Sequence, residues 1–589
     1  MSTEQIAVCH VGFLCQARKI AVIRNPQSQT FEVQNMAYNV ETAMGGEETF
    51  KAIYSAPIEM QHTVLGDYGV CDFSEVTQPG IYRVVLPQSN AYSYQFTISD
   101  GAFARLPFLF LDFIHELRSG FFTSDLHAPL HLDDGVRSDT GERWDAVGGW
   151  YDAGDMRKWM GHSTLPALAF MDIQDRLTLP RHTYNDQPAY DSDWLTETAW
   201  GLRLIFKMQD PETGMIFEDV GGGSTARKTD EMTWWYENHA GCYADNADNR
   251  ITDNVRGSGD ERTVRVHFNA IAQYTNIAIT ARAYALYAQF DAQIAAECYT
   301  FNERCWAFCE TKRDDESHYW TSVKAWRLCA ALERYRAGLS TRHEVDDALE
   351  SLLANFDADL GFWTQRAERD DPYRGILHSA QPIIALAKYL DFVDSKSERV
   401  IAILNACKAR YIVPLTNTNP YQFMPYGTYR TLPTDGELYR PLREGLSFRF
   451  VMPVNHFQKI NHGLSGHWMS WAHALAYAGR MLDDSDLTDL SWAQIHWLLG
   501  NNDVDVSMVS GVGYVNPMPH SRFLGTVIGG FCNGFRGTAD DIPTIDMARK
   551  AEWNSTEYWN VPLSNCLMAL SWLLPAKVKP SGKIGFANK

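Results

Sequence analysis

The chain has 589 residues, of which 45% are hydrophobic and 21% are charged, a composition typical of globular proteins with a sizeable core. Its formal net charge of −20 argues against binding to nucleic acid, whose phosphates would be repelled, and suits a cationic ligand. No stretch approaches the ~18 apolar residues that a membrane-spanning helix needs.

The first hundred residues have the pattern of short β-strands separated by turns. Runs rich in β-branched and aromatic residues occur at 19–25, 30–36, 81–86 and 91–99, and a Pro-Gly turn precedes the third of them. Strands at this spacing predict a small antiparallel sandwich.

The N-terminus and the cysteines indicate where the protein acts. The segment MSTEQIAVCHVGFLC has neither a basic region nor an apolar run of signal-peptide length. The eleven cysteines are scattered and form no CxxC pair, which is typical of reduced, buried thiols. We therefore expect a cytoplasmic protein.

From about Leu106 the hydrophobic period changes from 2 toward 3.6 residues, which indicates helices. Amphipathic or Ala-rich runs predict helices over 108–122, 192–209, 268–290, 322–338, 380–393 and 465–484. Long Gly/Asn/Asp-rich loops lie at 221–263 and 415–445, and loops of this length are usually functional. We predict two domains, an all-β sandwich over 1–103 and a large all-α domain over 104–589.

Residues 148–155, GGWYDAGD, carry two carboxylates three positions apart on a tight turn. Such a pair can hold one water, with Asp155 removing its proton and Asp152 orienting it. The glycines permit a ligand to approach the backbone closely, and Trp150 and Tyr151 are candidates for a sugar-stacking wall. The plainer interpretation makes Asp155 a helix N-cap and the aromatics core residues.

A water-activating base needs a proton donor across the scissile bond. Glu557 lies among aromatic residues, and Tyr558 beside it is a candidate substrate contact. A carboxyl in apolar surroundings has a raised pKa, as a general acid at neutral pH requires. Glu552 is the competing acid, and a surface glutamate is the plainer interpretation. His520 and Arg522 are candidates to hydrogen-bond sugar hydroxyls or the catalytic carboxylates.

Together these segments resemble glycoside hydrolase family 9 over nearly the whole chain. GGWYDAGD is similar to the family's GGWHDAGD, WLLGNNDVDVSMVSGVGYVNPMPHSR to its ILGRNP…NPPHHR block, and STEYWNVPL to its final acid-bearing segment. The resemblance implies an immunoglobulin-like module followed by an (α/α)6 barrel, and hydrolysis with inversion. It implies Asp155 as catalytic base, Asp152 as second water-holding aspartate and Glu557 as catalytic acid. His520 and Arg522 match subsite residues.

The chain departs from the family pattern where metals and substrate contacts are concerned. Leu130 stands where many relatives carry a zinc-binding cysteine, so we expect no zinc. The Asp-rich loop 245–254 has oxygen ligands of the kind that calcium takes, and a structural calcium is compatible with it, although a solvated loop is the plainer interpretation. Ser521 replaces a histidine of PHHR, which indicates altered substrate contacts. The implied chemistry requires no cofactor.

The expected substrate is short, because a chain without a signal peptide would act on imported sugars. The chain resembles the family's intracellular exo-β-D-glucosaminidase subgroup, which implies release of glucosamine from the non-reducing end of β-1,4 oligosaccharides derived from chitin or chitosan. An acidic cleft suits the ammonium group, and Asp139 is the candidate carboxylate for it.

Three alternatives stay open. One is a β-glucosidase, cellodextrinase or endoglucanase of the same family. Another is a non-catalytic carbohydrate-binding protein, which would not need Asp152, Asp155 and Glu557 together. The last is an (α/α)6 phosphorylase or lyase, which would need a phosphate site or a Tyr/His base instead.

Overall fold

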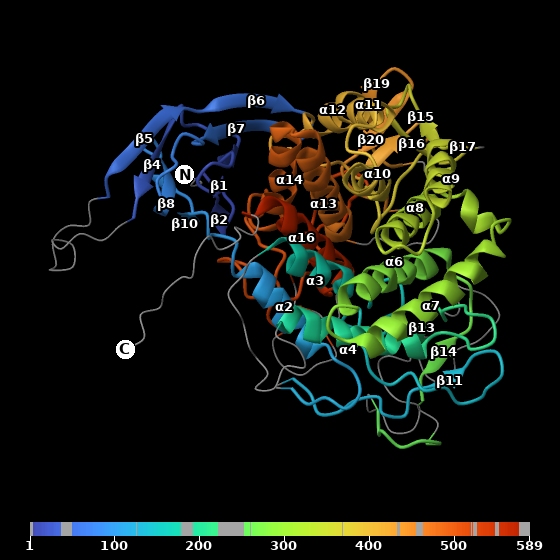
Figure 1. Cartoon of the computed structure of the whole chain (residues 1–589). Coiled ribbons are helices and arrows are strands. Elements are labelled where there is room, and N and C mark those ends of the chain that lie inside the picture. Colours follow the sequence, from blue (N-terminus) through green and yellow to red (C-terminus); the bar gives the residue numbers. More distant parts are fainter. Residues whose placement is uncertain are drawn as a thin grey trace, which may run out of the picture.

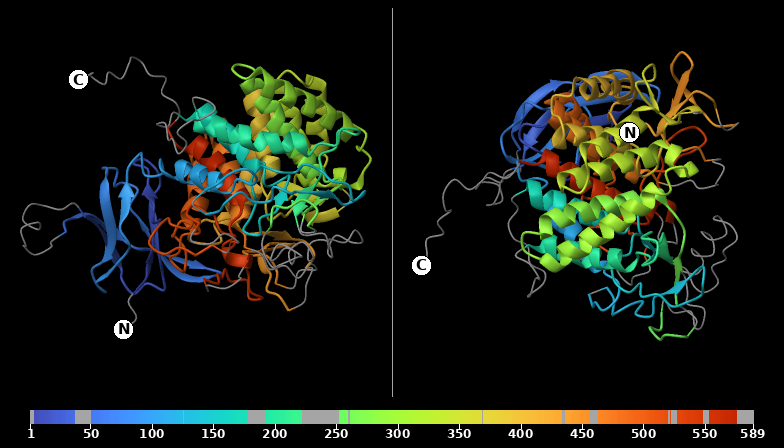
Figure 2. Two further views of the ribbon diagram at one scale, coloured as in Figure 1. Left: turned by 90° about the horizontal axis from the view of Figure 1, so that it is seen from below. Right: turned by 45° about the vertical axis from the view of Figure 1, so that its right-hand side comes forward.

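The structure is a computed structural model, and it describes residues 4–36, 50–124, 126–177, 192–221, 252–258, 261–367, 369–432, 436–454, 463–519, 521, 527–547 and 553–575. Strands from the first hundred residues stand at one side of a large helical region (Figure 1, Figure 2). Among the described helices, none is long and apolar enough to cross a membrane.

The N-terminal strands form two sheets around a shared core. One sheet has the order β1 (Ile6–Ala7), β3 (Ile20–Arg24), β7 (Gly66–Asp72), β6 (Glu59–Thr63). The other has the order β2 (Gly12–Phe13), β10 (Phe96–Ile98), β8 (Gly80–Leu86), β4 (Thr30–Asn35), β5 (Ala52–Pro57), with β9 (Ala91–Tyr92) paired to β8. Phe13 and Phe96 of the second sheet meet Phe73, which follows β7, with ring centroids 5.3–5.4 Å apart.

Twelve of the described helices form a barrel-like arrangement of two layers. Six inner helices pack in a ring, each against the next and the last against the first: α3 (Leu165–Arg176), α6 (Ala270–Tyr287), α8 (Thr321–Arg336), α10 (Gln381–Phe392), α13 (Ser465–Leu482) and α16 (Asn560–Leu573). Each also packs against an outer helix, in the same order α4 (Asp193–Lys207), α7 (Ala292–Glu310), α9 (Arg342–Leu353), α11 (Glu398–Cys407), α14 (Ser485–Leu498) and α2 (Leu106–Glu116). The inner helices are enclosed by the outer layer, and α16 is buried along its length from Asn560 to Ser571.

A chain of buried charges links four successive inner helices. Arg282 of α6 contacts Asp172 of α3 at 2.6 Å and Glu333 of α8 at 3.6 Å, and Lys388 of α10 also pairs with Glu333. Burial works to raise the pKa of Asp172, but Arg282 together with the other nearby cations outweighs it, and the pKa falls to about 2. Removal of one partner would leave the other charge buried and uncompensated.

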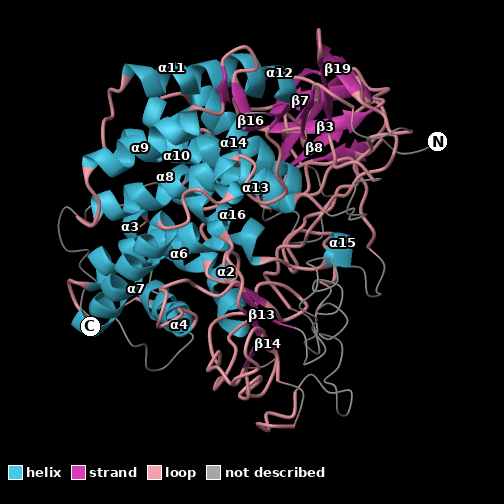
Figure 3. Cartoon of the chain, turned by 90° about the vertical axis from the view of Figure 1, so that its right-hand side faces the viewer, coloured by secondary structure: helices cyan, strands magenta, loops and turns pink. Residues whose placement is uncertain are grey.

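Loops gather on one side of the helices, with the short helix α15 (Trp553–Thr556) among them (Figure 3). They contain three small sheets: β11 (Val136–Arg137), β14 (Thr263–Arg265), β13 (Asp219–Gly221), β12 (Lys158–Trp159); β15 (Phe356–Asp357), β16 (Phe362–Arg366), β17 (Arg369–Pro372); and β18 (Gly427–Tyr429), β20 (Leu446–Arg449), β19 (Arg440–Arg443). Three further short helical segments lie at Glu316–Tyr319, Lys408–Ile412 and α12 (Val413–Thr416). The long loop predicted at 415–445 therefore carries strands of its own.

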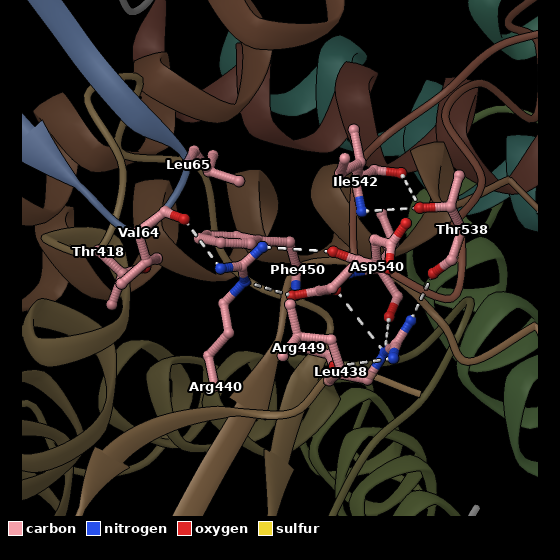
Figure 4. A network of polar contacts seen from close by, with 12 residues as sticks. Val64, Leu65, Thr418, Leu438, Arg440, Arg449, Phe450, Thr538, Asp540 and Ile542 are labelled. Atoms are coloured by element: carbon pink, nitrogen blue, oxygen red, sulfur yellow. Dashed lines mark hydrogen bonds and ion pairs between the residues drawn. The ribbon is translucent and has the colours of Figure 1, made fainter. Parts of the chain in front are cut away.

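The N-terminal sheets contact the helical region through polar groups. Arg440 of β19 donates from Nη1 to the carbonyl oxygen of Val64 at 2.8 Å and pairs through Nε with Asp541 at 3.0 Å (Figure 4). At a second contact, His10 Nε2 lies 2.9 Å from Asp505 Oδ1 in the loop after α14. The ring of Phe13 in β2 also packs on His496 of α14, with centroids 4.8 Å apart, so the regions are joined through both polar and apolar contacts.

Glu197 of α4 holds the segment that precedes the aspartate turn. It accepts the indole N–H of Trp150 at 2.7 Å, two N–H groups of Arg118 at 2.9 and 2.7 Å, and lies 3.0 Å from His115 Nδ1. Burial works to raise the pKa of Glu197, but Arg118 and His115 outweigh it and lower the pKa to about 2. The carboxylate therefore stays ionised inside the protein.

We expect Glu197→Gln to lower the free energy of unfolding at pH 7 by about 3–5 kcal/mol, because Arg118 is left as an uncompensated buried charge. A carboxyl whose folded pKa lies below its ordinary 4.5 stabilises the fold above pH 4.5, and this contribution is lost as the pH falls from 4.5 toward 2. Melting temperatures of wild type and variant should therefore converge on acidification. The exposed Glu350→Gln is the control, and a constant difference at all pH values would contradict the account.

Candidate active site

One cleft of about 530 Å³ lies where the N-terminal ends of the inner helices meet. Most of its lining residues stand at or before the start of α3, α6, α8, α10 and α16, and they include Trp159, His162, Asn269, Ser322, Tyr373, Arg374, His378 and Trp559. The ring thus brings together segments that are far apart in the sequence. Most of these positions are loop or first-turn residues carried on a rigid scaffold, as is common for binding sites.

The two aspartates of the GGWYDAGD turn do not line this cleft themselves. Asp152 is linked to it by Trp159 and Trp559, which line the cleft and hydrogen-bond to its carboxylate. Asp152 is 1% exposed and Asp155 is 8% exposed. The turn closes on Arg157, whose N–H donates to Asp155 Oδ1 at 3.1 Å and whose carbonyl accepts the N–H of Asp152 at 2.9 Å. Gly149 has a φ of 71°, and a Cβ there would lie 2.2 Å from the Leu204 side chain. The backbone just before the turn therefore requires glycine at this position.

Asp152 is oriented by two tryptophans that line the cleft. Its Oδ1 accepts the backbone N–H of Trp159 at 3.2 Å, and its Oδ2 accepts the indole N–H of Trp559 at 3.3 Å. Burial raises the pKa of Asp152 well above its usual range, and the charge of Asp155 raises it further. The negative charge of Asp155 therefore disfavours ionisation of Asp152.

The Glu557 segment is joined to the aspartate turn by backbone hydrogen bonds. Trp559 forms an antiparallel bridge with Ala153, and Asn560 donates its N–H to the carbonyl of Asp152 at 2.9 Å. On the other side, Glu557 accepts the N–H of Asn533 through its carbonyl at 2.7 Å. The turn and the segment that carries Glu557 therefore form one small structural unit at the cleft.

Tyr558 connects the two halves of this unit electrostatically. Its ring is buried edge-on against Phe113, with centroids 5.0 Å apart, and its hydroxyl lies 3.2 Å from Ser521 Oγ. Burial raises the pKa of Tyr558, and the carboxylates of Glu557 and Asp155 raise it further. The charges of both Glu557 and Asp155 therefore act on the hydroxyl of Tyr558.

Four lining residues of the cleft were not predicted from the sequence: Trp159, His162, His378 and Trp559. His162 lies edge-on to Trp559, with ring centroids 5.6 Å apart, and 6.2 Å from His378. Burial lowers the pKa of His162 to about 4 and that of His378 to about 3, so both imidazoles are neutral at physiological pH. Trp159 follows the aspartate turn by a few residues, and Trp559 follows Glu557 by a few residues. This closeness in the sequence was the signal that could have identified them.

Three predicted substrate contacts have other surroundings in the structure. Trp150 is 1% exposed and bonded to Glu197, so it is a core residue rather than a wall of the cleft. Tyr151 is fully buried, and its hydroxyl lies 2.7 Å from His131 Nδ1. Asp139 forms a bidentate ion pair with Arg137 at 3.0 and 2.8 Å, so its charge is already matched by a guanidinium.

Other predicted residues lie outside the described part of the chain. These are His520, Arg522, Glu552 and most of the loops 221–263 and 245–254. Among the described residues, no group of three or more His, Cys, Asp or Glu is arranged to hold a metal ion. At the position compared with a zinc-binding cysteine, Leu130 accepts the N–H of Gly120 through its carbonyl at 3.0 Å.

Comparisons with known proteins connect this geometry to one family. The family model described as glycosyl hydrolase family 9 matches residues 110–527. A cellodextrinase of Butyrivibrio fibrisolvens is 32% identical over 28% of this chain, and a xyloglucan-specific endo-beta-1,4-glucanase of Bacteroides ovatus is 24% identical over 37% of it. The chain spans only 29% and 38% of these relatives. A solved metagenome-derived family 9 endoglucanase superposes with a TM-score of 0.68 and 18% identity, over 97% of this chain and 99% of that chain, which shows a shared fold.

Proposed function

The chain belongs to glycoside hydrolase family 9, and on this basis we propose that it hydrolyses bonds between β-linked sugars in short oligosaccharides, with inversion at the anomeric carbon. The observation that carries the proposal is the backbone pairing of the aspartate turn with the Glu557 segment beside the cleft. This pairing joins the segment of the candidate base, Asp155, to the segment of the candidate acid, Glu557, and inverting hydrolysis needs one base and one acid.

In the proposed mechanism, Asp152 and Asp155 hold the attacking water. Asp155 takes its proton as the water attacks the anomeric carbon, and Glu557 protonates the glycosidic oxygen so that the leaving sugar departs neutral. The N–H groups of Trp159 and Trp559 keep Asp152 oriented during this step. These steps require neither a metal nor another cofactor.

The same proposal extends to the architecture. The regular alternation of inner and outer helices along the chain supports an (α/α)6 barrel for the helical region. The two packed sheets of the first hundred residues support an immunoglobulin-like module. Under this proposal the module braces the loops around the cleft and does not take part in chemistry.

The finer proposal concerns the sugar: glucosamine released from the non-reducing end of short β-1,4 chains, in the cytoplasm. The net charge of −20 favours the approach of a cationic sugar, and the indoles of Trp159 and Trp559 line the cleft, where ring faces attract an ammonium group. All ten described cysteines are buried free thiols, as is usual in a reducing compartment. Asp139 gives no support, because Arg137 already matches its charge.

Hydrolysis of glucose-based chains is the second candidate. It is favoured by the names of two similar proteins, a cellodextrinase and a xyloglucan-specific endo-beta-1,4-glucanase. A purely carbohydrate-binding function is disfavoured, because binding alone does not need buried paired aspartates joined to a third carboxyl group.

The substrate comparison is kcat/KM on glucosamine disaccharide, its N-acetylated form and cellobiose. We expect a preference of about 5- to 100-fold for the glucosamine disaccharide, because a site that pairs with the ammonium loses ~1–3 kcal/mol when a neutral hydroxyl takes its place. Asp155→Asn protein from the same purification is the control for contaminating glycosidases. Equal or better hydrolysis of cellobiose would reject the amino-sugar proposal and leave the roles of Asp152, Asp155 and Glu557 intact.

A further inference from the structure

Arg157 forms a buried ion pair that the mechanism above does not use. Its side chain is 1% exposed and pairs with Asp219 of β13, whose side chain is fully buried. Taking two charges out of water is costly, and well-packed apolar residues often serve stability equally well. Stability alone therefore does not require an ion pair here. Its position directly after the two carboxylates of the turn indicates a role in the site.

The backbone of Arg157 contacts both aspartates. Its N–H donates to Asp155 Oδ1, and its carbonyl accepts the N–H of Asp152. Because the turn closes on this one residue, a displacement of Arg157 moves both carboxylates together. The side chain of Arg157 anchors that residue to β13, which lies outside the turn.

Three features fix where the side chain of Arg157 lies. Its guanidinium stacks on the indole of Trp159, 4.2 Å from the ring centroid, and the N–H of Trp159 binds Asp152. Strands β12 and β13 pair so that Trp159 lies opposite Asp219. Gly221 leaves the space that the side chain fills, since a Cβ there would lie 2.8 Å from Arg157 Nε and 2.9 Å from its Cγ.

The charge of Arg157 acts on Asp152. Burial and the charge of Asp155 raise the pKa of Asp152, whereas Arg157 and the N–H groups of Trp159 and Trp559 act in the opposite direction. Without the guanidinium, the aspartate pair would be harder to ionise. Because the base works in its ionised form, the acid limb of the pH–rate profile would then move to higher pH.

We propose that Arg157, anchored by Asp219, is a positioning residue that keeps Asp152 and Asp155 aligned on the attacking water. The proposal rests on the hydrolase function stated above. Mutations can separate its two contributions, which are the anchored position of the side chain and its positive charge. Gly221→Ala disturbs the position of the side chain and leaves its charge, whereas Arg157→Met removes anchor and charge together.

The test compares Arg157→Met, Asp219→Asn and Gly221→Ala in the full chain with wild type, on a sugar that wild type cleaves. We expect each variant to lower kcat by about 10- to 100-fold with KM nearly unchanged, since small displacements of reacting groups have effects of this size. Only Arg157→Met should move the acid limb of kcat/KM to higher pH. Glu333→Gln is the matched control, because it changes a buried ion pair in the helix ring, and it should lower the melting temperature without changing kcat or the pH profile.

Near-wild-type kcat in folded Asp219→Asn and Gly221→Ala would overturn the proposal, and these two variants decide it even if Arg157→Met does not fold. An equal loss of kcat in Glu333→Gln would also overturn it, because the effect would then reflect general stability. A wild-type protein that cleaves none of the tested sugars would contradict the proposed function, and this inference with it. Active wild type with unaffected variants would contradict the inference alone.

Discussion

Replacement of Asp155 by asparagine is expected to lower kcat by about 10²- to 10⁴-fold, the usual contribution of a general base. The fold should persist, because the amide oxygen of asparagine can still accept the N–H of Arg157 that Asp155 accepts at 3.1 Å. Turnover is measured by release of an aryl group and of reducing sugar, and folding by circular dichroism and melting temperature.

Asp145→Asn is the matched control for this experiment. Its side chain is 64% exposed and pairs with Lys207 at the surface, where substitutions usually change stability by no more than about 0.5 kcal/mol. Near-full activity of Asp155→Asn would reject Asp155 as the base. If Asp152→Asn then abolished turnover, the two aspartates would exchange roles.

Glu557→Gln should lower kcat by about 10²- to 10⁴-fold on natural oligosaccharides, because the glycosidic oxygen then leaves without a proton. The loss should be much smaller on a dinitrophenyl glycoside, whose leaving group is stable as an anion. This dependence on the leaving group distinguishes an acid from a residue that only supports the fold, since structural damage would affect both substrates alike.

Glu552→Gln is the control that decides between the two candidate acids. It removes the same charge five positions earlier in the chain and should leave both substrates hydrolysed at wild-type rates. If Glu552→Gln showed the leaving-group dependence and Glu557→Gln did not, the assignment of the acid would be wrong while the aspartate pair kept its role.

Strands and helices with a strong hydrophobic period were predictable from the sequence. The runs at 19–25, 30–36 and 81–86 are β3, β4 and β8, and the last N-terminal strand and the first helix are separated by only seven residues, from Ser99 to Arg105. Strands β5 and β6 were missed because they are largely exposed edge strands without a buried alternating face. The run at 91–99 was predicted as one strand but is divided into β9 and β10.

The candidate site was predictable only where its residues are adjacent in the sequence. The paired aspartates share one turn, so the motif displays them together, whereas His162 and His378 meet only because the starts of α3 and α10 face each other across one end of the ring. The partner of Asp139 is two residues away, but an ion pair with Arg137 cannot be distinguished from a free carboxylate by residue type. The histidine pair therefore needed the tertiary fold, and the Asp139 ion pair needed the local side-chain geometry.

The measurement that tests the central claim most directly is the anomeric form of the first product, followed by proton NMR during hydrolysis of a β-linked substrate. If Asp152 and Asp155 direct a water onto the anomeric carbon while Glu557 protonates the leaving oxygen, the α-anomer appears first and converts to the β-anomer only by mutarotation. Initial formation of the β-anomer would show retention, and would contradict the shared-water arrangement at the aspartate turn.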